Sequence, residues 1–130
     1  MGNPPPTQED MLGVWEGTSL AACGFGMSVP TRCNAEQLIT ITLTAEDNGQ
    51  IGGYYRCAYG NMNCYNMNTT GKIARVSIDR SLLTVLVLMP DGTSCRYQGR
   101  NVNNMINGGY SCSSGASQFE QGTWRATHKY

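Results

Sequence analysis

The sequence predicts an all-β fold: about eight short strands in an antiparallel up-and-down (meander) barrel stapled by disulfides, with a flattened β-sandwich as the alternative. Three observations support this fold class. Apolar and polar residues alternate over short segments, hairpin-length turn sequences separate those segments, and the 130 residues include six cysteines. Eight consecutive antiparallel strands close most simply into a barrel, because closure removes both exposed edges.

Length and composition set the outer limits. A chain of this length is one domain. We expect residues 1–10 to be a flexible Pro-rich linker and residues 11–130 to be a single β-barrel domain. The nine acidic and nine basic side chains cancel, and no basic stripe exists, so no nucleic-acid partner is expected. The sequence also lacks the long apolar run of a transmembrane segment.

The cysteines indicate disulfides and an oxidising compartment. Zinc would need close ligand pairs such as C-x-x-C, which this sequence lacks. We therefore expect a periplasmic, cell-surface or secreted protein. Lipid anchoring of a bacterial envelope domain, through a residue outside this sequence, is a further hypothesis. The predicted disulfides are Cys23–Cys33, Cys57–Cys64 and Cys95–Cys112.

The first half of the chain contains three expected strands. Met11–Thr18 is the first and carries Trp15 as a large buried anchor, before an irregular stretch over 19–35. Glu36–Thr44 alternates cleanly with a period of two. The turn Asp47-Asn48-Gly49 then leads into the third strand. The expected cross-strand pairs, all on one face, are Leu43 with Gly53, Ile41 with Tyr55 and Ile39 with Cys57.

A second irregular stretch over 58–71 precedes the next hairpin. Its strands are expected at Lys72–Asp79 and Leu82–Met89, joined by a turn at Arg80-Ser81. The predicted inward residues are Ala74, Val76 and Ile78 on the first strand and Leu83, Val85 and Val87 on the second. The outer face of the second strand then carries an apolar patch, which either the N-terminal segment or a partner covers, for example a second copy in a homodimer. Its residues are Leu82, Leu86 and Leu88. A turn shifted by one residue at Arg80-Ser81 is the alternative, because it would exchange the two faces.

The run from Ser94 to Cys112 folds back on itself around Asn103-Asn104. This mirror predicts the pairs Cys95 with Cys112, Tyr97 with Tyr110 and Gly99 with Gly108. The preceding turn, Pro90-Asp91-Gly92, independently predicts another set: Val87 with Cys95, Val85 with Tyr97 and Leu83 with Gly99. Both turns select the same inner face.

The last strand is expected at Gln118–Thr127. It contains Gly122-Thr123-Trp124, which matches the Gly13-Val14-Trp15 of the first strand. In a closed barrel these two strands are neighbours across the seam.

Gly13-Val14-Trp15 in the first strand of a small meander barrel resembles the opening of the calycin-type proteins, the lipocalins and avidins. The resemblance implies an eight-stranded barrel that holds a small ligand inside, with Trp15 as a floor or wall residue. Small bacterial periplasmic inhibitors of proteases and of lysozyme also use disulfide-bearing barrels of this size, and some of the protease inhibitors have a similar first-strand tryptophan.

Aromatic side chains are the candidate ligand-binding residues. Tyrosine offers an apolar ring and a hydroxyl that needs a partner. The functional interpretation is a pocket at one mouth of the barrel, covered by the loops over 19–35 and 58–71. The alternative is that the rings only fill the narrow interior. The residues are Tyr55, Tyr97, Tyr110, Trp15 and Trp124.

Catalysis finds little support in the sequence. His128 is the single histidine and lies near the C-terminus, so a Ser/His/Asp or Cys/His arrangement is hard to build. A glycosidase-type pair of Glu16 and Glu120 is the weakest alternative. We expect no enzymatic activity, no cofactor and no metal.

Two functions follow as hypotheses. The first is an extracytoplasmic protein that binds a small molecule in the barrel mouth. The alternative is a protein-binding envelope module, such as an inhibitor or accessory lipoprotein. An open, aromatic-lined interior would favour the first, and a packed interior would favour the second.

Overall fold

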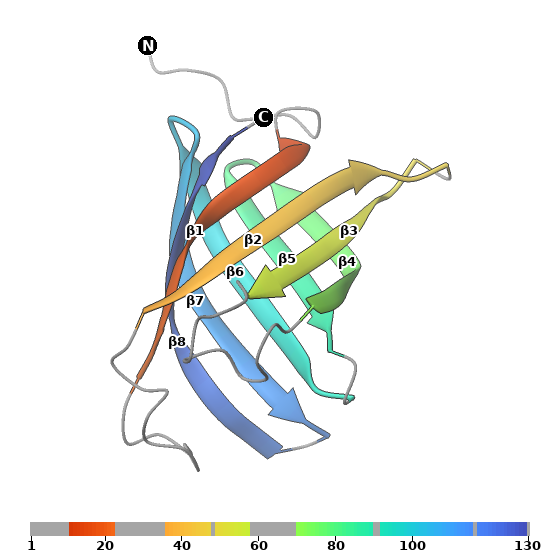
Figure 1. The fold of residues 1–130 in the computed structure, drawn as a ribbon. Coiled ribbons are helices and arrows are strands. Elements are labelled where there is room, and N and C mark those ends of the chain that lie inside the picture. The colour runs from red at the N-terminus through yellow and green to blue at the C-terminus, as the bar shows by residue number, and fades with distance from the viewer. Residues whose placement is uncertain are drawn as a thin grey trace.

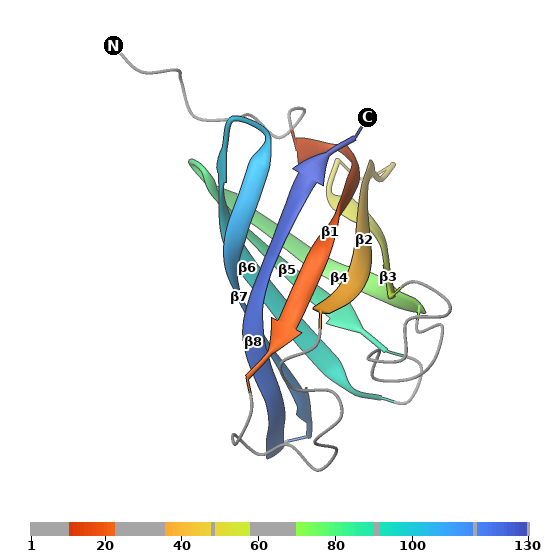
Figure 2. The ribbon, with the colours of Figure 1, turned by 60° about the vertical axis from the view of Figure 1, so that its left-hand side comes forward.

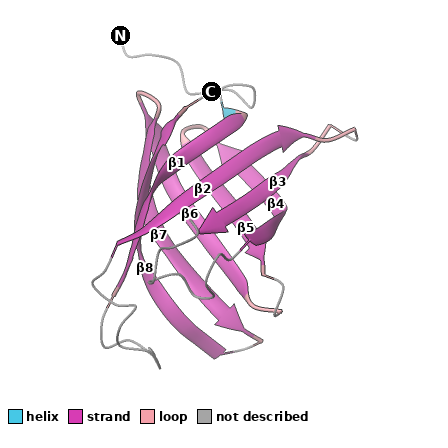
Figure 3. Ribbon diagram, viewed as in Figure 1, coloured by secondary structure: helices cyan, strands magenta, loops and turns pink. Residues whose placement is uncertain are grey.

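Eight strands follow one another around a closed antiparallel barrel, and the last strand pairs with the first (Figure 1). The computed structural model describes residues 11–22, 36–47, 49–57, 70–89, 92–115 and 117–129, and of residues 21 and 117–120 the backbone alone. Strands dominate the described chain (Figure 3), which confirms the predicted fold class. The strands are β1 Gly13–Ala21, β2 Glu36–Ala45, β3 Ile51–Cys57, β4 Thr70–Asp79, β5 Leu82–Leu88, β6 Ser94–Val102, β7 Met105–Ser114 and β8 Ser117–His128.

The hairpin registers are those that the turn sequences predict. All three predicted pairs are present between β2 and β3, between β5 and β6, and between β6 and β7. The two loops of three residues close as expected: the Glu46 amide donates to the Gln50 carbonyl over 2.8 Å, and the Met89 amide donates to the Thr93 carbonyl over 2.8 Å. Local turn chemistry therefore determines which side chains enter the barrel.

The tight turns place residues in the left-handed region where their chemistry allows it. Asn103 and Asn104 have φ values of 54° and 64°, which is the type I′ geometry that matches the twist of a hairpin. Arg80 has a φ of 59°, although arginine gains nothing from that conformation. The hydrophobic register of β4 and β5 imposes this turn.

The first strand differs from its predicted bounds. β1 begins at Gly13 and continues to Ala21, where Thr18 was the expected end. Pairing with β2 and β8 on both sides carries the strand past Thr18, because each added residue gains ladder hydrogen bonds. Ser19, expected in an irregular stretch, therefore lies inside a strand.

The predicted inner face of β4 is wrong at one position. A register irregularity between Ile73 and Arg75 makes Ala74 an extra residue opposite β5. Ala74 is exposed, and Ile73 is the buried residue in its place. After the bulge Val76 and Ile78 pack against the core as predicted. A bulge shifts the alternation by one residue, so strict period-two counting fails there.

β3 and β4 pair over only part of their lengths. Their ladder runs from Arg56–Thr70 to Gly53–Ile73. Gly53 has a φ of 140°, and a Cβ there would overlap the Thr42 carbonyl oxygen, so only glycine permits this bend. Beyond it the β2–β3 hairpin diverges from β4 (Figures 1 and 2).

The core is a single cluster inside the barrel, formed by the inward residues of all eight strands. The predicted Cys95–Cys112 disulfide joins β6 to β7, and both cysteines are buried. Cys57 is also disulfide-bonded. The predicted pairings Cys23–Cys33 and Cys57–Cys64 involve residues outside the described ones, and so does the predicted linker over 1–10. None of the described segments is a helix long and apolar enough to cross a membrane.

Candidate functional site in the barrel interior

Four of the five predicted aromatic residues form one buried cluster. Tyr97 is its centre: it stacks on Tyr110 with ring centroids 5.0 Å apart and meets the edge of Trp124 at 5.5 Å. The Tyr97 hydroxyl donates to the Tyr55 hydroxyl over 3.1 Å, across the barrel from β6 to β3. All four residues are 5% exposed or less. The interior therefore presents flat rings with hydroxyl groups between them.

Glycines make room for these rings. Trp124 lies opposite Gly108 in the β7–β8 ladder, and its indole N–H donates to the Gln98 carbonyl over 3.2 Å. A Cβ on Gly108 would overlap that same carbonyl oxygen. The pair Gly99 and Gly108, which the hairpin mirror predicts, thus lets β6 and β7 approach closely beneath the indole ring.

Two polar side chains continue this inner surface. Ser19 on β1 lies directly opposite Gln37 on β2. They are 2% and 4% exposed, and within the described part of the chain neither the Ser19 Oγ nor the Gln37 Nε2 has a hydrogen-bond partner. A buried polar atom without a partner costs about 1–3 kcal/mol. Among the described residues the Asn101 Oδ1 is a third such atom, but Ser19 and Gln37 are the two that lie opposite each other.

The contacts connect the polar pair to the aromatic cluster in a ring around the interior. Ser19 lies opposite Trp124 across the seam, and Trp124 contacts Tyr97. On the other side the Gln37 Oε1 is 3.7 Å from the Cys57 Sγ, and Cys57 follows Tyr55 on the inner face of β3. We call this ring the interior site: Ser19, Gln37, Tyr55, Tyr97, Tyr110 and Trp124.

The interior site combines flat apolar rings with hydrogen-bond donors. Its rings can hold a flat apolar body, and the Gln37 amide and Ser19 hydroxyl can both donate to an oxygen acceptor. The interior of an eight-stranded barrel is either filled by side chains or holds one small ligand. Among the described residues, no group of three His, Cys, Asp or Glu side chains could hold a metal ion.

Trp15 belongs to a different group of side chains. Its ring stacks on His128 with centroids 4.5 Å apart, and its indole N–H donates to the Met11 carbonyl over 2.9 Å. The Asn101 amide in turn donates to the Met11 Sδ over 3.4 Å. The sequence alone predicts no role for His128. In the structure its ring forms this stack, and its Nε2 lies 2.7 Å from the Leu12 carbonyl oxygen. This group closes one end of the barrel.

The remaining predicted residues lie on the outside or apart. Leu88 is 46% exposed, and Leu82 and Leu86 are half-buried on the same outer face. Glu16 is exposed and pairs with Thr127, whereas Glu120 stands seven positions earlier on β8, about 23 Å away at the usual rise per residue. That spacing exceeds the reach of a glycosidase pair.

Sequence reasoning missed Ser19 and Gln37 for different reasons. Gln37 shares the inner face of Ile39, Ile41 and Leu43 by simple alternation, so the signal was present in the strand that the sequence predicts. Ser19 gave no such signal, because its strand was expected to end at Thr18.

Fold and interior site together define an eight-stranded up-and-down β-barrel protein with an aromatic and polar interior, consistent with a calycin-like barrel. Comparisons with protein-family models, with curated proteins and with solved structures return no match for this chain.

Proposed function

We propose that this chain is a non-catalytic, extracytoplasmic binding protein that holds a small molecule in the mouth of its calycin-like barrel. One observation carries the proposal: two polar atoms, the Ser19 Oγ and the Gln37 Nε2, are buried opposite each other and have no hydrogen-bond partner among the residues that the structure describes. A ligand oxygen that accepts from both would offset the cost of burying them. The Cys95–Cys112 disulfide supports an oxidising location.

The ligand that fits best is a small molecule with a flat apolar portion and a carbonyl- or carboxyl-type oxygen. The flat portion would lie among the rings of Tyr55, Tyr97 and Trp124, and the oxygen would face Ser19 and Gln37. Ring contacts of this kind are favourable beyond the area that they bury.

The test is native mass spectrometry of the protein purified from its own source, followed by extraction of any bound molecule. We expect an added small-molecule mass, retained in wild type and largely lost in Gln37→Leu and Ser19→Ala. Gln98→Leu is the matched control, because the Gln98 amide already donates to the Thr84 hydroxyl over 2.9 Å on another part of the barrel wall. A protein without added mass, whose crystal structure places only water at Ser19 and Gln37, would contradict the proposal.

A protein-binding envelope module is the second candidate. It is favoured by large apolar side chains that stay exposed on the outer face, among them Leu38 at 56%, Tyr54 at 61% and Leu88 at 46%. Such side chains are more common where a partner covers them. A crystal structure in which side chains fill the interior completely would select this candidate over the first.

A further inference from the structure

The second half of β4 has an unpaired edge. Arg75–Asp79 pairs with β5 on one side, whereas the ladder to β3 stops at Ile73. Within the described part of the chain, no strand pairs with this edge of residues 75–79. Unpaired strand edges are templates for another strand, so a folded protein must protect or use them.

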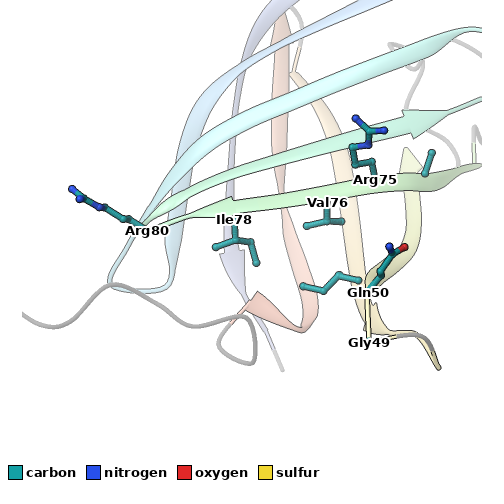
Figure 4. A pocket seen from close by; sticks show the side chains of 8 residues that line it. Gly49, Gln50, Arg75, Val76, Ile78 and Arg80 are labelled. Atoms are coloured by element: carbon teal, nitrogen blue, oxygen red, sulfur yellow. The ribbon is translucent and has the colours of Figure 1, made fainter.

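The edge opens into a surface cleft of about 600 Å³ between β4 and the β2–β3 hairpin (Figure 4). Val76 and Ile78 point into this cleft, and Arg75 points to the opposite side of the strand. Val76 and Ile78 are half-buried, whereas Arg75, Ser77 and Asp79 are exposed. The edge therefore has an apolar inner row and a charged outer row.

The backbone N–H and C=O groups of Val76 and Ile78 face the unpaired edge of the strand. Asp79 and Leu82 close the two-residue turn at Arg80-Ser81, and the closing pair of such a hairpin exchanges hydrogen bonds. Because bonding alternates along an antiparallel pair, Arg75, Ser77 and Asp79 direct their backbone groups at β5. The N–H and C=O groups of Val76 and Ile78 then point outward along the sheet.

The sequence of this edge is complementary to itself. If a second copy pairs with it in antiparallel register about Ser77, Val76 lies opposite the second copy's Ile78, and Arg75 lies opposite the second copy's Asp79. The first pair exchanges two backbone hydrogen bonds and extends the apolar row, and the second pair is a salt bridge on the outer face. The two-fold axis repeats both contacts.

We propose that this edge, Arg75–Asp79, is a dimerisation surface whose occupant is the same segment of a second copy of this chain. The observations that select this occupant are the charge complementarity of Arg75 with Asp79 and the match of Val76 with Ile78. Within the described residues neither Arg75 nor Asp79 has an ion-pair partner in its own chain. The proposal is independent of any ligand in the interior site.

The experiment is sedimentation velocity over a concentration series, with charge-reversed variants. Wild type should shift toward a two-chain species as concentration rises. Arg75→Glu places like charges opposite Asp79, and Asp79→Arg places like charges opposite Arg75, so each should weaken the dimer at least about tenfold. An equimolar mixture of the two variants should recover the dimer, because every facing pair is then opposite in charge.

Two controls make the result specific. Arg96 is exposed on β6, and Arg96→Glu changes the net charge by the same amount as Arg75→Glu. This variant should dimerise like wild type. The double variant Arg75→Glu/Asp79→Arg should also dimerise, because it exchanges the two charges. Circular dichroism checks that each variant is folded. The proposal is overturned if wild type stays monomeric, if the single variants dimerise unchanged, or if the mixture stays monomeric.

Discussion

Gln37 occupies a position that alternation reserves for an apolar side chain. The same face of β2 continues with Ile39, Ile41 and Leu43, all 2% exposed or less. A polar residue in such a row costs free energy unless something pairs with it. Its neighbour Ser19 repeats the anomaly on β1. Two adjacent exceptions to the pattern are more informative about function than the many residues that obey it.

Replacing Gln37 by leucine should therefore stabilise the ligand-free protein. The change removes the unpaired Nε2 and adds apolar contact, so we expect the free energy of unfolding to rise by about 1 kcal/mol. Gln98→Leu should lower it by about 0.5–1.5 kcal/mol, because that amide has a partner. Urea denaturation measures both. Destabilisation of similar size in both variants would mean that the Gln37 amide is satisfied.

At the scale of elements, the hairpins show where sequence reasoning succeeds. The mirror about Asn103-Asn104 and the turn before β6 each predict the β6 face, and the two agree because both act through local geometry. Prediction fails at Ala74, where the bulge depends on how β4 meets β3 and β5. The local sequence of β4 does not show where its pairing with β3 ends and the bulge begins. The interior site was predictable only in part. The hairpin registers place its rings inside the barrel, but Ser19 could be placed there only by knowing that β1 continues past Thr18.

Gly108 and Gly109 offer a matched test of strand packing on β7. A Cβ on Gly108 would overlap the Gln98 carbonyl oxygen, whereas one on Gly109 would come no closer than 3.4 Å to the Gly122 carbonyl oxygen. Gly108→Ala should cost about 1–3 kcal/mol, as overpacking does. Gly109→Ala should change stability by less than about 0.5 kcal/mol. Thermal unfolding followed by circular dichroism compares them, and equal costs would refute the close approach.

The Cys95–Cys112 disulfide should contribute substantially to the stability of the β6–β7 pair. It closes a loop with a sequence separation of 17, for which the chain-entropy estimate is about 3 kcal/mol. Cys95→Ala/Cys112→Ala should lose stability of that order in guanidinium denaturation while keeping the barrel's β-sheet circular dichroism spectrum. Unchanged stability would show that the ladder alone holds the two strands.

At the scale of the whole molecule, one end of the barrel is closed by a side chain from outside the strands. Met11 is fully buried and contacts both Trp15 and Asn101. It precedes β1, which begins at Gly13 and not at Met11 as the sequence predicts. Ser19 and Gln37 lie four residue pairs further along β1 and β2 than Trp15 and Ile41, toward the end where we propose the mouth of the site.

Removing this closure should destabilise the whole barrel. We expect Met11→Ala to lower the free energy of unfolding by about 2–5 kcal/mol, the usual cost of truncating a buried methionine. Met105→Ala is the matched control, because Met105 is 44% exposed and should cost less than about 0.5 kcal/mol. Differential scanning calorimetry measures both, and a small effect at Met11 would show that the barrel end closes without it.

The seam between β1 and β8 also shapes how the chain folds. Trp15 pairs with His128, so the ladder that closes the barrel joins the two ends of the described sequence. During synthesis β1 emerges first, and the edge of β1 that pairs with β8 stays unpaired until β8 has left the ribosome. Contacts of such long range form slowly, and open edges invite association between chains. A nascent chain that stalls before β8 is therefore expected to aggregate rather than to persist as a seven-stranded sheet.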